Sequence, residues 1–91
     1  MKVFEYSWHA LSKFELSEIK KLKIDKEHVE KVIRKPKVID KIDKPVLMAI
    51  GELNKTLSLC VLYKKAKQGI RIITFFPAEK GRYEYKILQG R

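Results

Sequence analysis

Apolar residues in the first part of the chain recur at helical spacing. Ser7 is a suitable N-cap, and the residues after it predict a helix over residues 8–22. Its inward stripe comprises Trp8, Leu11, Ile19 and Leu22, with Phe14 on the flank. Asp25 is a second N-cap candidate for a helix over residues 26–34, and Pro36 ends that helix. The inward residues of this second helix are Val29, Val32 and Ile33.

The remaining chain has the pattern of strands. Residues 46–53 are mostly apolar, residues 56–64 are rich in Leu and Val, and residues 70–76 are dense in β-branched and aromatic residues, with Pro77 expected to end this last run. Residues 38–42 predict a weak strand, and residues 2–6 are a candidate first strand. Residues 79–88 fit a strand or a helix, although Gly81 weakens the helical interpretation.

Helices that precede strands in separate blocks favour an α+β fold. We expect a single domain over residues 1–91, with two N-terminal helices packed on one face of a three- to four-stranded antiparallel sheet. The other face of the sheet would then be open to a ligand.

Charge narrows the choice of partner. The 91 residues include 21 Lys and Arg against 11 Asp and Glu, a formal net charge of +10. Such an excess attracts polyanions, so a nucleic acid or an acidic protein is the expected partner. This expectation depends on the cations gathering over the open face of the sheet.

Several classes of protein lack support in the sequence. Cys60 is the single cysteine, so no internal disulfide can form, and its apolar surroundings predict a core position. No apolar run approaches the ~20 residues of a membrane helix and none resembles a signal peptide, so a cytoplasmic location is expected. The scattered glycines and two distant histidines predict neither a phosphate loop nor a zinc site, and no cofactor or metal is expected.

The remaining chemistry suits metal-free RNA cleavage, which requires a base, cations around the phosphate and an acid. His9, Arg71 and Tyr83 are the candidate catalytic residues. The candidate nucleic-acid-binding residues are Lys13, Lys64, Lys80 and Arg82. Each has an ordinary structural alternative: His9 could pack or cap a helix, Tyr83 could belong to the core, and the cations could be surface charge.

Three stretches resemble a family of small prokaryotic domains of unknown function that is similar to the BrnT toxins and more distantly to the RelE/ParE toxins. They are Trp8-His9-Ala10-Leu11, the Ile24–Ile33 helix with its Lys35-Pro36 end, and a strand pair that includes Leu59–Tyr63 and Arg71–Thr74. The resemblance implies a RelE/BrnT-like fold. It also implies a messenger-RNA endoribonuclease of a toxin–antitoxin system, whose target could be bound to the ribosome and which an acidic antitoxin would neutralise.

By position, His9 and Arg71 match the family's early histidine and strand arginine, and Thr74 falls where BrnT-like chains carry Ser or Thr. Where those chains have a further arginine, this chain has Phe76. That departure favours a second hypothesis, a non-catalytic nucleic-acid-binding module. A third is a protein-interaction module whose positive face meets an antitoxin.

Overall fold

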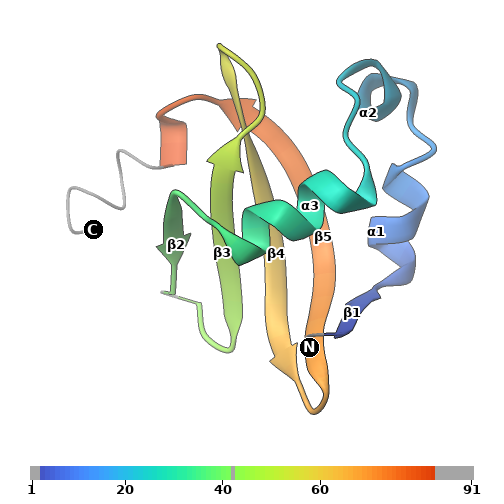
Figure 1. Cartoon of the computed structure of the whole chain (residues 1–91), viewed down its shortest axis with the longest axis vertical. Coiled ribbons are helices and arrows are strands. Elements are labelled where there is room, and N and C mark those ends of the chain that lie inside the picture. Colours follow the sequence, from blue (N-terminus) through green and yellow to red (C-terminus); the bar gives the residue numbers. More distant parts are fainter. Residues whose placement is uncertain (1–2, 42, 84–91) are drawn as a thin grey trace.

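The computed structural model describes residues 3–41 and 43–83. These residues form three helices and a five-stranded sheet, whose arrangement is shown in Figure 1. The elements run in the order β1 (Val3–Tyr6), α1 (Trp8–Lys13), α2 (Ser17–Lys21), α3 (Lys26–Arg34), β2 (Val38–Asp40), β3 (Val46–Glu52), β4 (Leu57–Ala66) and β5 (Gly69–Glu79). The fold is therefore α+β, as predicted, with one more helix and at least one more strand than expected.

The sheet is mixed and has the order β1-β5-β4-β3-β2. Strands β2 to β5 form the predicted antiparallel meander, whereas β1 pairs in parallel with the first residues of β5. No local pattern could indicate this pairing, because Val3 and its partner Gly69 lie 66 positions apart in the sequence. Gly69 is required at this contact, since a Cβ there would overlap the Val3 backbone.

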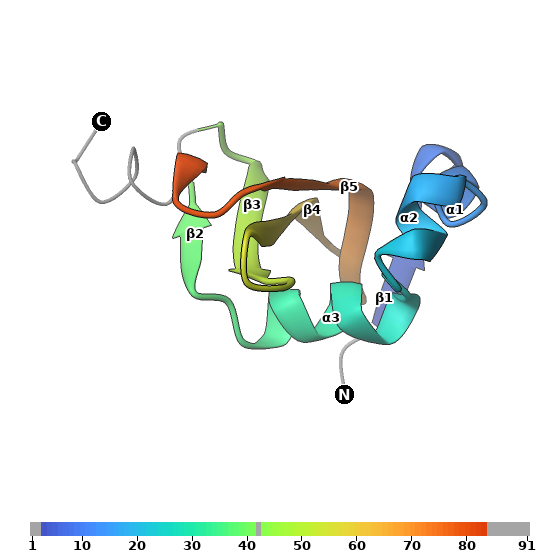
Figure 2. The ribbon, with the colours of Figure 1, turned by 90° about the horizontal axis from the view of Figure 1, so that it is seen from above.

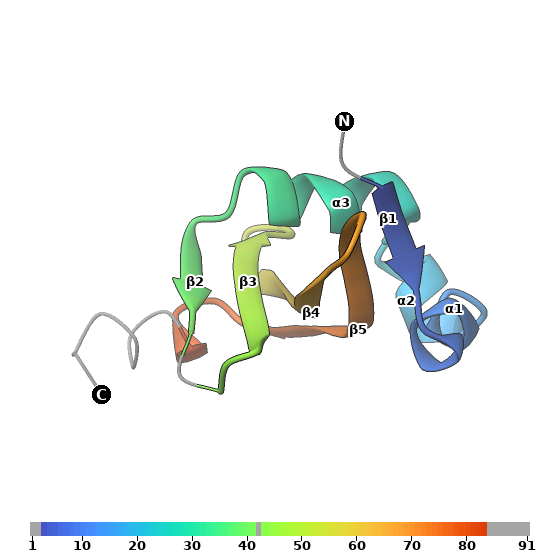
Figure 3. The same ribbon diagram turned by 90° about the horizontal axis from the view of Figure 1, so that it is seen from below.

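The sheet is strongly curved. In the β4–β5 register, Leu62 pairs with Thr74 and Tyr63 with Ile72, so Ile73 is skipped and forms a bulge. A bulge bends its strand and increases the twist. Seen from above and from below, β5 bends along its length, and α3 lies within the curve of the sheet (Figures 2 and 3).

Helix α3 was predicted correctly, including its boundaries. The Asp25 carboxylate accepts a hydrogen bond from the His28 N–H at 2.8 Å, which caps the helix. Its predicted inward residues, Val29, Val32 and Ile33, are buried against the inner face of the sheet. Gly51 on β3 permits this approach, because a Cβ there would lie 2.9 Å from a methyl of Val32.

The single helix predicted over residues 8–22 was wrong. Leu16 adopts an extended backbone conformation and separates α1 from α2. The break lets the Phe14 ring pack between Tyr6 and Phe75, at centroid distances of 6.0 and 4.8 Å. Because α1 then faces the sheet through Ala10, Trp8 is 84% exposed and not inward-facing as predicted.

Helices α1 and α2 lie beside the β1–β5 edge (Figure 1). The pairing of β1 with β5 ends at Ile72, and beyond that residue α1 lies along this edge of β5. Ser7 Oγ donates to the Ile73 carbonyl and Lys13 Nζ to the Phe75 carbonyl, both at 2.6 Å. Exposed strand edges invite unwanted pairing, so these contacts protect the edge as well as anchoring the helix.

We had expected the sheet face opposite α3 to be open to a ligand, but part of this face is buried. Ile50 and Cys60 are fully buried there, with Met48, Phe76 and Tyr83 packed around them. The core position predicted for Cys60 is confirmed.

The predicted end of the last strand at Pro77 was wrong, because β5 continues to Glu79. The Lys80 N–H donates to the Thr56 carbonyl. Because backbone N–H groups alternate in direction along a strand, this bond places the Pro77 nitrogen on the side away from β4. The N–H that proline lacks therefore removes no hydrogen bond between β4 and β5. Of the ambiguous stretch over residues 79–88, positions 84–88 lie outside the described residues.

Candidate functional site

The three predicted catalytic residues come from three separate parts of the fold. His9 is exposed in the first turn of α1, and Arg71 is exposed near the start of β5. Tyr83 follows the far end of β5 and packs edge-on against Phe76, at 6.0 Å between ring centroids. Phe76 lies five residues along β5 from Arg71, a step of roughly 16 Å at ~3.3 Å per residue, so the structure does not bring Tyr83 and Arg71 together.

The predicted binding residues are also dispersed. Lys64 and Arg71 are cross-strand partners on β4 and β5. Lys80 lies at the other end of the sheet, 3.7 Å from a carboxylate oxygen of Glu52, and Arg82 is exposed two residues later. The cations we expected to share one surface therefore occupy both ends of β5.

The Lys13 side chain contacts β5, and these contacts mainly stabilise the fold. Its Nζ lies 5.8 Å from the ring centroids of Phe75 and Phe76 and bonds the Phe75 carbonyl. Burial lowers the pKa of Lys13 from its ordinary value. Nearby on β5, Thr74 Oγ1 is buried and has no hydrogen-bond partner among the described residues.

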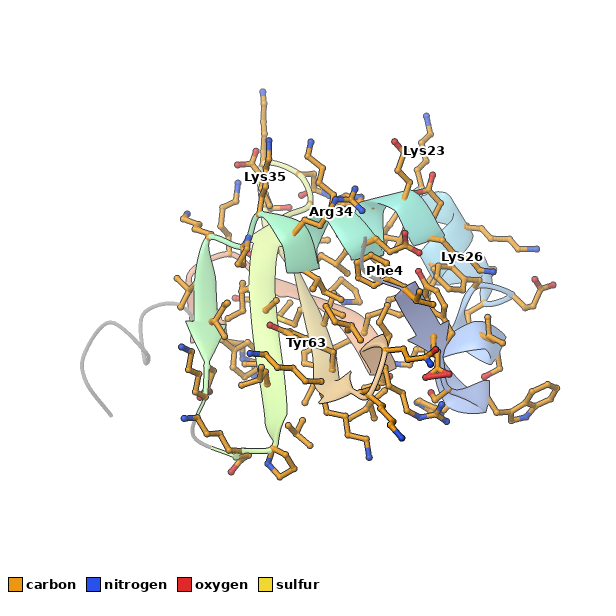
Figure 4. All side chains as sticks on the ribbon, turned by 60° about the horizontal axis from the view of Figure 1, so that its bottom comes forward. Phe4, Lys23, Lys26, Arg34, Lys35 and Tyr63 are labelled. Atoms are coloured by element: carbon orange, nitrogen blue, oxygen red, sulfur yellow. The ribbon has the colours of Figure 1, made fainter. Side chains whose placement is uncertain are left out.

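The expectation that cations gather over the open sheet face was wrong. Figure 4 shows Lys23, Lys26, Arg34 and Lys35 projecting from α3 and its flanking residues. Lys64 and Arg71 adjoin Tyr63 and Ile72, which are buried with α3, so by strand alternation they face the other side of the sheet. Around α2 and α3 the cations are interspersed with exposed acids. Glu15 pairs with Lys20 at 3.8 Å, and Asp25 and Glu27 lie at the start of α3.

A cavity along one side of α3 illustrates this balance. Its lining includes three cations, Lys23, Lys31 and Lys35, and three acids, Asp25, Glu27 and Glu52. His28 lies between them, with Nε2 3.2 Å from the Glu52 carbonyl oxygen. A nearly neutral surface of this kind gives little attraction to a polyanion.

Two adjoining cavities at the lower end of the sheet differ in charge. One, of about 530 Å³, lies below the C-terminal end of α3, and the other, of about 520 Å³, lies at the β2–β3 turn. They share Lys41, Leu47 and Lys65. We call the two cavities together the basic groove; its charged lining residues are Arg34, Lys41, Lys44 and Lys65, with no acid among the described lining residues.

The fold assembles the charged lining of the groove from three segments of the chain, since Lys41 and Lys44 share the β2–β3 connection. Arg34 is the last residue of α3, Lys41 follows β2, Lys44 belongs to the β2–β3 turn, and Lys65 lies near the end of β4. Because β2, β3 and β4 are neighbours, the β2–β3 turn and the β4–β5 hairpin emerge at the same end of the sheet (Figure 1). The cations therefore come together through topology and not through sequence proximity.

The floor of the groove is apolar. Leu47 and Tyr63 are cross-strand partners on β3 and β4, and Ile39 on β2 lies beside them. Tyr63 is only 5% exposed, and burial raises the pKa of its hydroxyl, which therefore stays protonated at neutral pH. Figure 4 shows Tyr63 below α3, on the same side of the sheet as Arg34.

Sequence reasoning missed this groove. It named Lys64 but not Lys65, and it assigned no role to Lys41 or Lys44. The available signal was the pair of lysine-bearing turns at residues 41–45 and 64–67. Strand order was needed to show that these turns are adjacent.

Comparison with known proteins gives no relative. No family model, curated protein or solved structure matches the chain. Within the described part of the chain, none of the helices has the length and apolar character needed to cross a membrane.

Proposed function

We propose that this chain binds a nucleic acid, and that the basic groove is the surface that contacts the phosphate backbone. The observation that carries the proposal is the groove itself, where four cations line adjoining cavities that have no described acidic lining residue. A nucleic acid gains affinity mainly by releasing counterions as its phosphates are neutralised. The overall charge of +10 would draw such a ligand towards the protein over a longer range.

Binding is favoured over RNA cleavage by the separation of Tyr83 from Arg71, together with Phe76 at the place of a BrnT-like arginine. An endoribonuclease needs its base, cations and acid around one scissile phosphate. The toxin activity and its acidic antitoxin, which the family resemblance implies, stay predictions. An antitoxin would be a competing ligand of the same groove.

The test is the salt dependence of binding to a fluorescein-labelled single-stranded RNA, measured by anisotropy. If all four groove cations contact phosphates, log K should fall with log salt at a slope of about −2.8, since each contact contributes about 0.7 for a single strand. Replacing two of them, in Lys41→Gln/Lys65→Gln, should weaken binding at low salt and reduce the slope by about 1.4.

The matched control is Lys21→Gln/Lys55→Gln, which removes the same charge from exposed positions on α2 and the β3–β4 hairpin. It should leave the slope nearly unchanged. Equal loss in both double variants would mean that dispersed charge, and not the groove, holds the RNA. Absence of binding by the parent protein at ~50 mM salt would refute the function itself.

A further inference from the structure

We propose that the basic groove receives one unpaired nucleotide, with its base against the apolar floor and its phosphate beside Arg34, Lys41 and Lys65. This inference rests on the proposed function and deepens it, because it makes the chain selective for single strands. It concerns the floor of the groove, whereas the nucleic-acid binding proposed above depends only on its charged rim.

The shape and lining of the groove lead to this ligand. Its two cavities, of about 530 and 520 Å³, adjoin one another, and sites for small organic groups usually span roughly 300–1,000 Å³. A site that bound only phosphate groups would need cations at its surface but no apolar cavity. A concave floor of Leu47, Tyr63 and Ile39 below a cationic rim suits a ligand with an apolar body and an anionic group, as a nucleotide has.

The strand selectivity follows from access. A base in a duplex is stacked and paired, and extracting it costs a few kcal/mol, whereas an unpaired base is free to leave the strand. Placing such a base against Leu47 and Ile39 removes apolar surface from water, which contributes about 25 cal/mol per Å² buried. A groove that uses this contribution must favour single strands over duplexes that present the same phosphates.

Tyr63 supplies a polar contact within the floor. Its hydroxyl forms no hydrogen bond with another described residue, although its side chain is almost completely buried. As a protonated hydroxyl it can donate to a base acceptor or to a phosphate oxygen. The hydroxyl is accessible to water, and it can exchange a water molecule for an acceptor on the nucleotide when the ligand binds.

The first experiment compares a labelled 12-nucleotide RNA with its duplex, using the parent protein and Leu47→Lys. This substitution adds a cation but makes the floor polar. If charge alone holds the RNA, single-strand binding should become tighter, whereas if a base contacts the floor, single-strand binding should become weaker. If a base enters the groove, Leu47→Lys should weaken single-strand binding at least about fivefold and leave duplex binding equal or tighter. The control Thr56→Lys adds the same charge at the opposite hairpin and should not weaken either ligand.

Tighter binding of both RNAs by Leu47→Lys would overturn the proposal and leave charge-driven nucleic-acid binding intact. So would equal affinity of the parent protein for the single strand and the duplex. An oligoglutamate peptide that binds the parent as tightly as the RNA, and is weakened equally by Leu47→Lys, would instead assign the groove to an acidic protein.

Duplex binding and thermal unfolding report whether Leu47→Lys is folded. Should it fail to fold, Tyr63→Phe decides, since it keeps the ring and removes only the hydroxyl. A two- to tenfold loss confined to the single strand, the usual effect of one hydrogen bond, supports the proposal. Unchanged single-strand binding by Tyr63→Phe overturns it.

Discussion

Replacing Ser7 by Ala tests how α1 is held against the free edge of β5. Ser7 Oγ accepts a hydrogen bond from the Ala10 N–H at 3.0 Å and donates one to the Ile73 carbonyl at 2.6 Å. Loss of an N-cap typically costs ~1 kcal/mol, and the loss of a further hydrogen bond costs ~0.5–1.5 kcal/mol. The free energy of unfolding should therefore fall by about 1.5–2.5 kcal/mol, which lowers Tm by roughly 6–20 °C in a domain of this size.

The measurement is urea unfolding followed by circular dichroism. Ser12→Ala is the matched control, because Ser12 Oγ donates only to the His9 carbonyl, at 2.8 Å on the exposed surface of the same helix. It should change the stability by no more than about 0.5 kcal/mol. Ser7→Thr keeps a hydroxyl and should recover part of the loss. A Ser7→Ala variant as stable as Ser12→Ala would refute the proposed anchoring of α1.

Two further predictions concern packing and pH. Gly51→Ala should destabilise the fold by about 1–3 kcal/mol, because the new methyl meets Val32, and the double variant with Val32→Ala should lose less than the two single losses added, as measured by chemical unfolding. Burial and the hydrogen bond to Glu30 raise the pKa of Tyr6, and burial raises that of Tyr63. Their folded pKa values exceed the unfolded value, so their contribution to stability is complete below pH ~10 and is lost as pH rises further. Between pH ~9.5 and ~11, stability should fall less steeply in Tyr6→Phe/Tyr63→Phe than in the parent, and parallel curves would contradict this assignment.

The elements that could be predicted from the sequence are those with strong local signals. Helix α3 has a capping aspartate, three inward aliphatic residues and a proline after its end, and it was located with correct boundaries. The main strands β3, β4 and β5 have runs of β-branched and aromatic residues and were placed to within three residues. The helix over residues 8–22 failed, because the burial of Phe14 between Tyr6 and Phe75 outweighed continuous helical hydrogen bonding.

The candidate site shows the same division. Composition indicated a polyanion partner, but the residues chosen from sequence proximity and family resemblance lie at both ends of β5 and on α1. The groove cations Arg34, Lys41 and Lys65 are ordinary surface residues in the sequence. Nothing in their local context distinguishes them from Lys21 or Lys55, which are not among the residues that line the groove.

The sequence by itself determined the class of fold, the caps of α1 and α3, the burial of Cys60 and the excess of positive charge, because each depends on composition or on neighbours along the chain. Tertiary structure alone decided the parallel pairing of β1 with β5, the partial burial of the second sheet face and the location of a group of cations with no acid among the described residues that line their groove. These features arise where distant segments meet, and the order of the strands sets which segments those are.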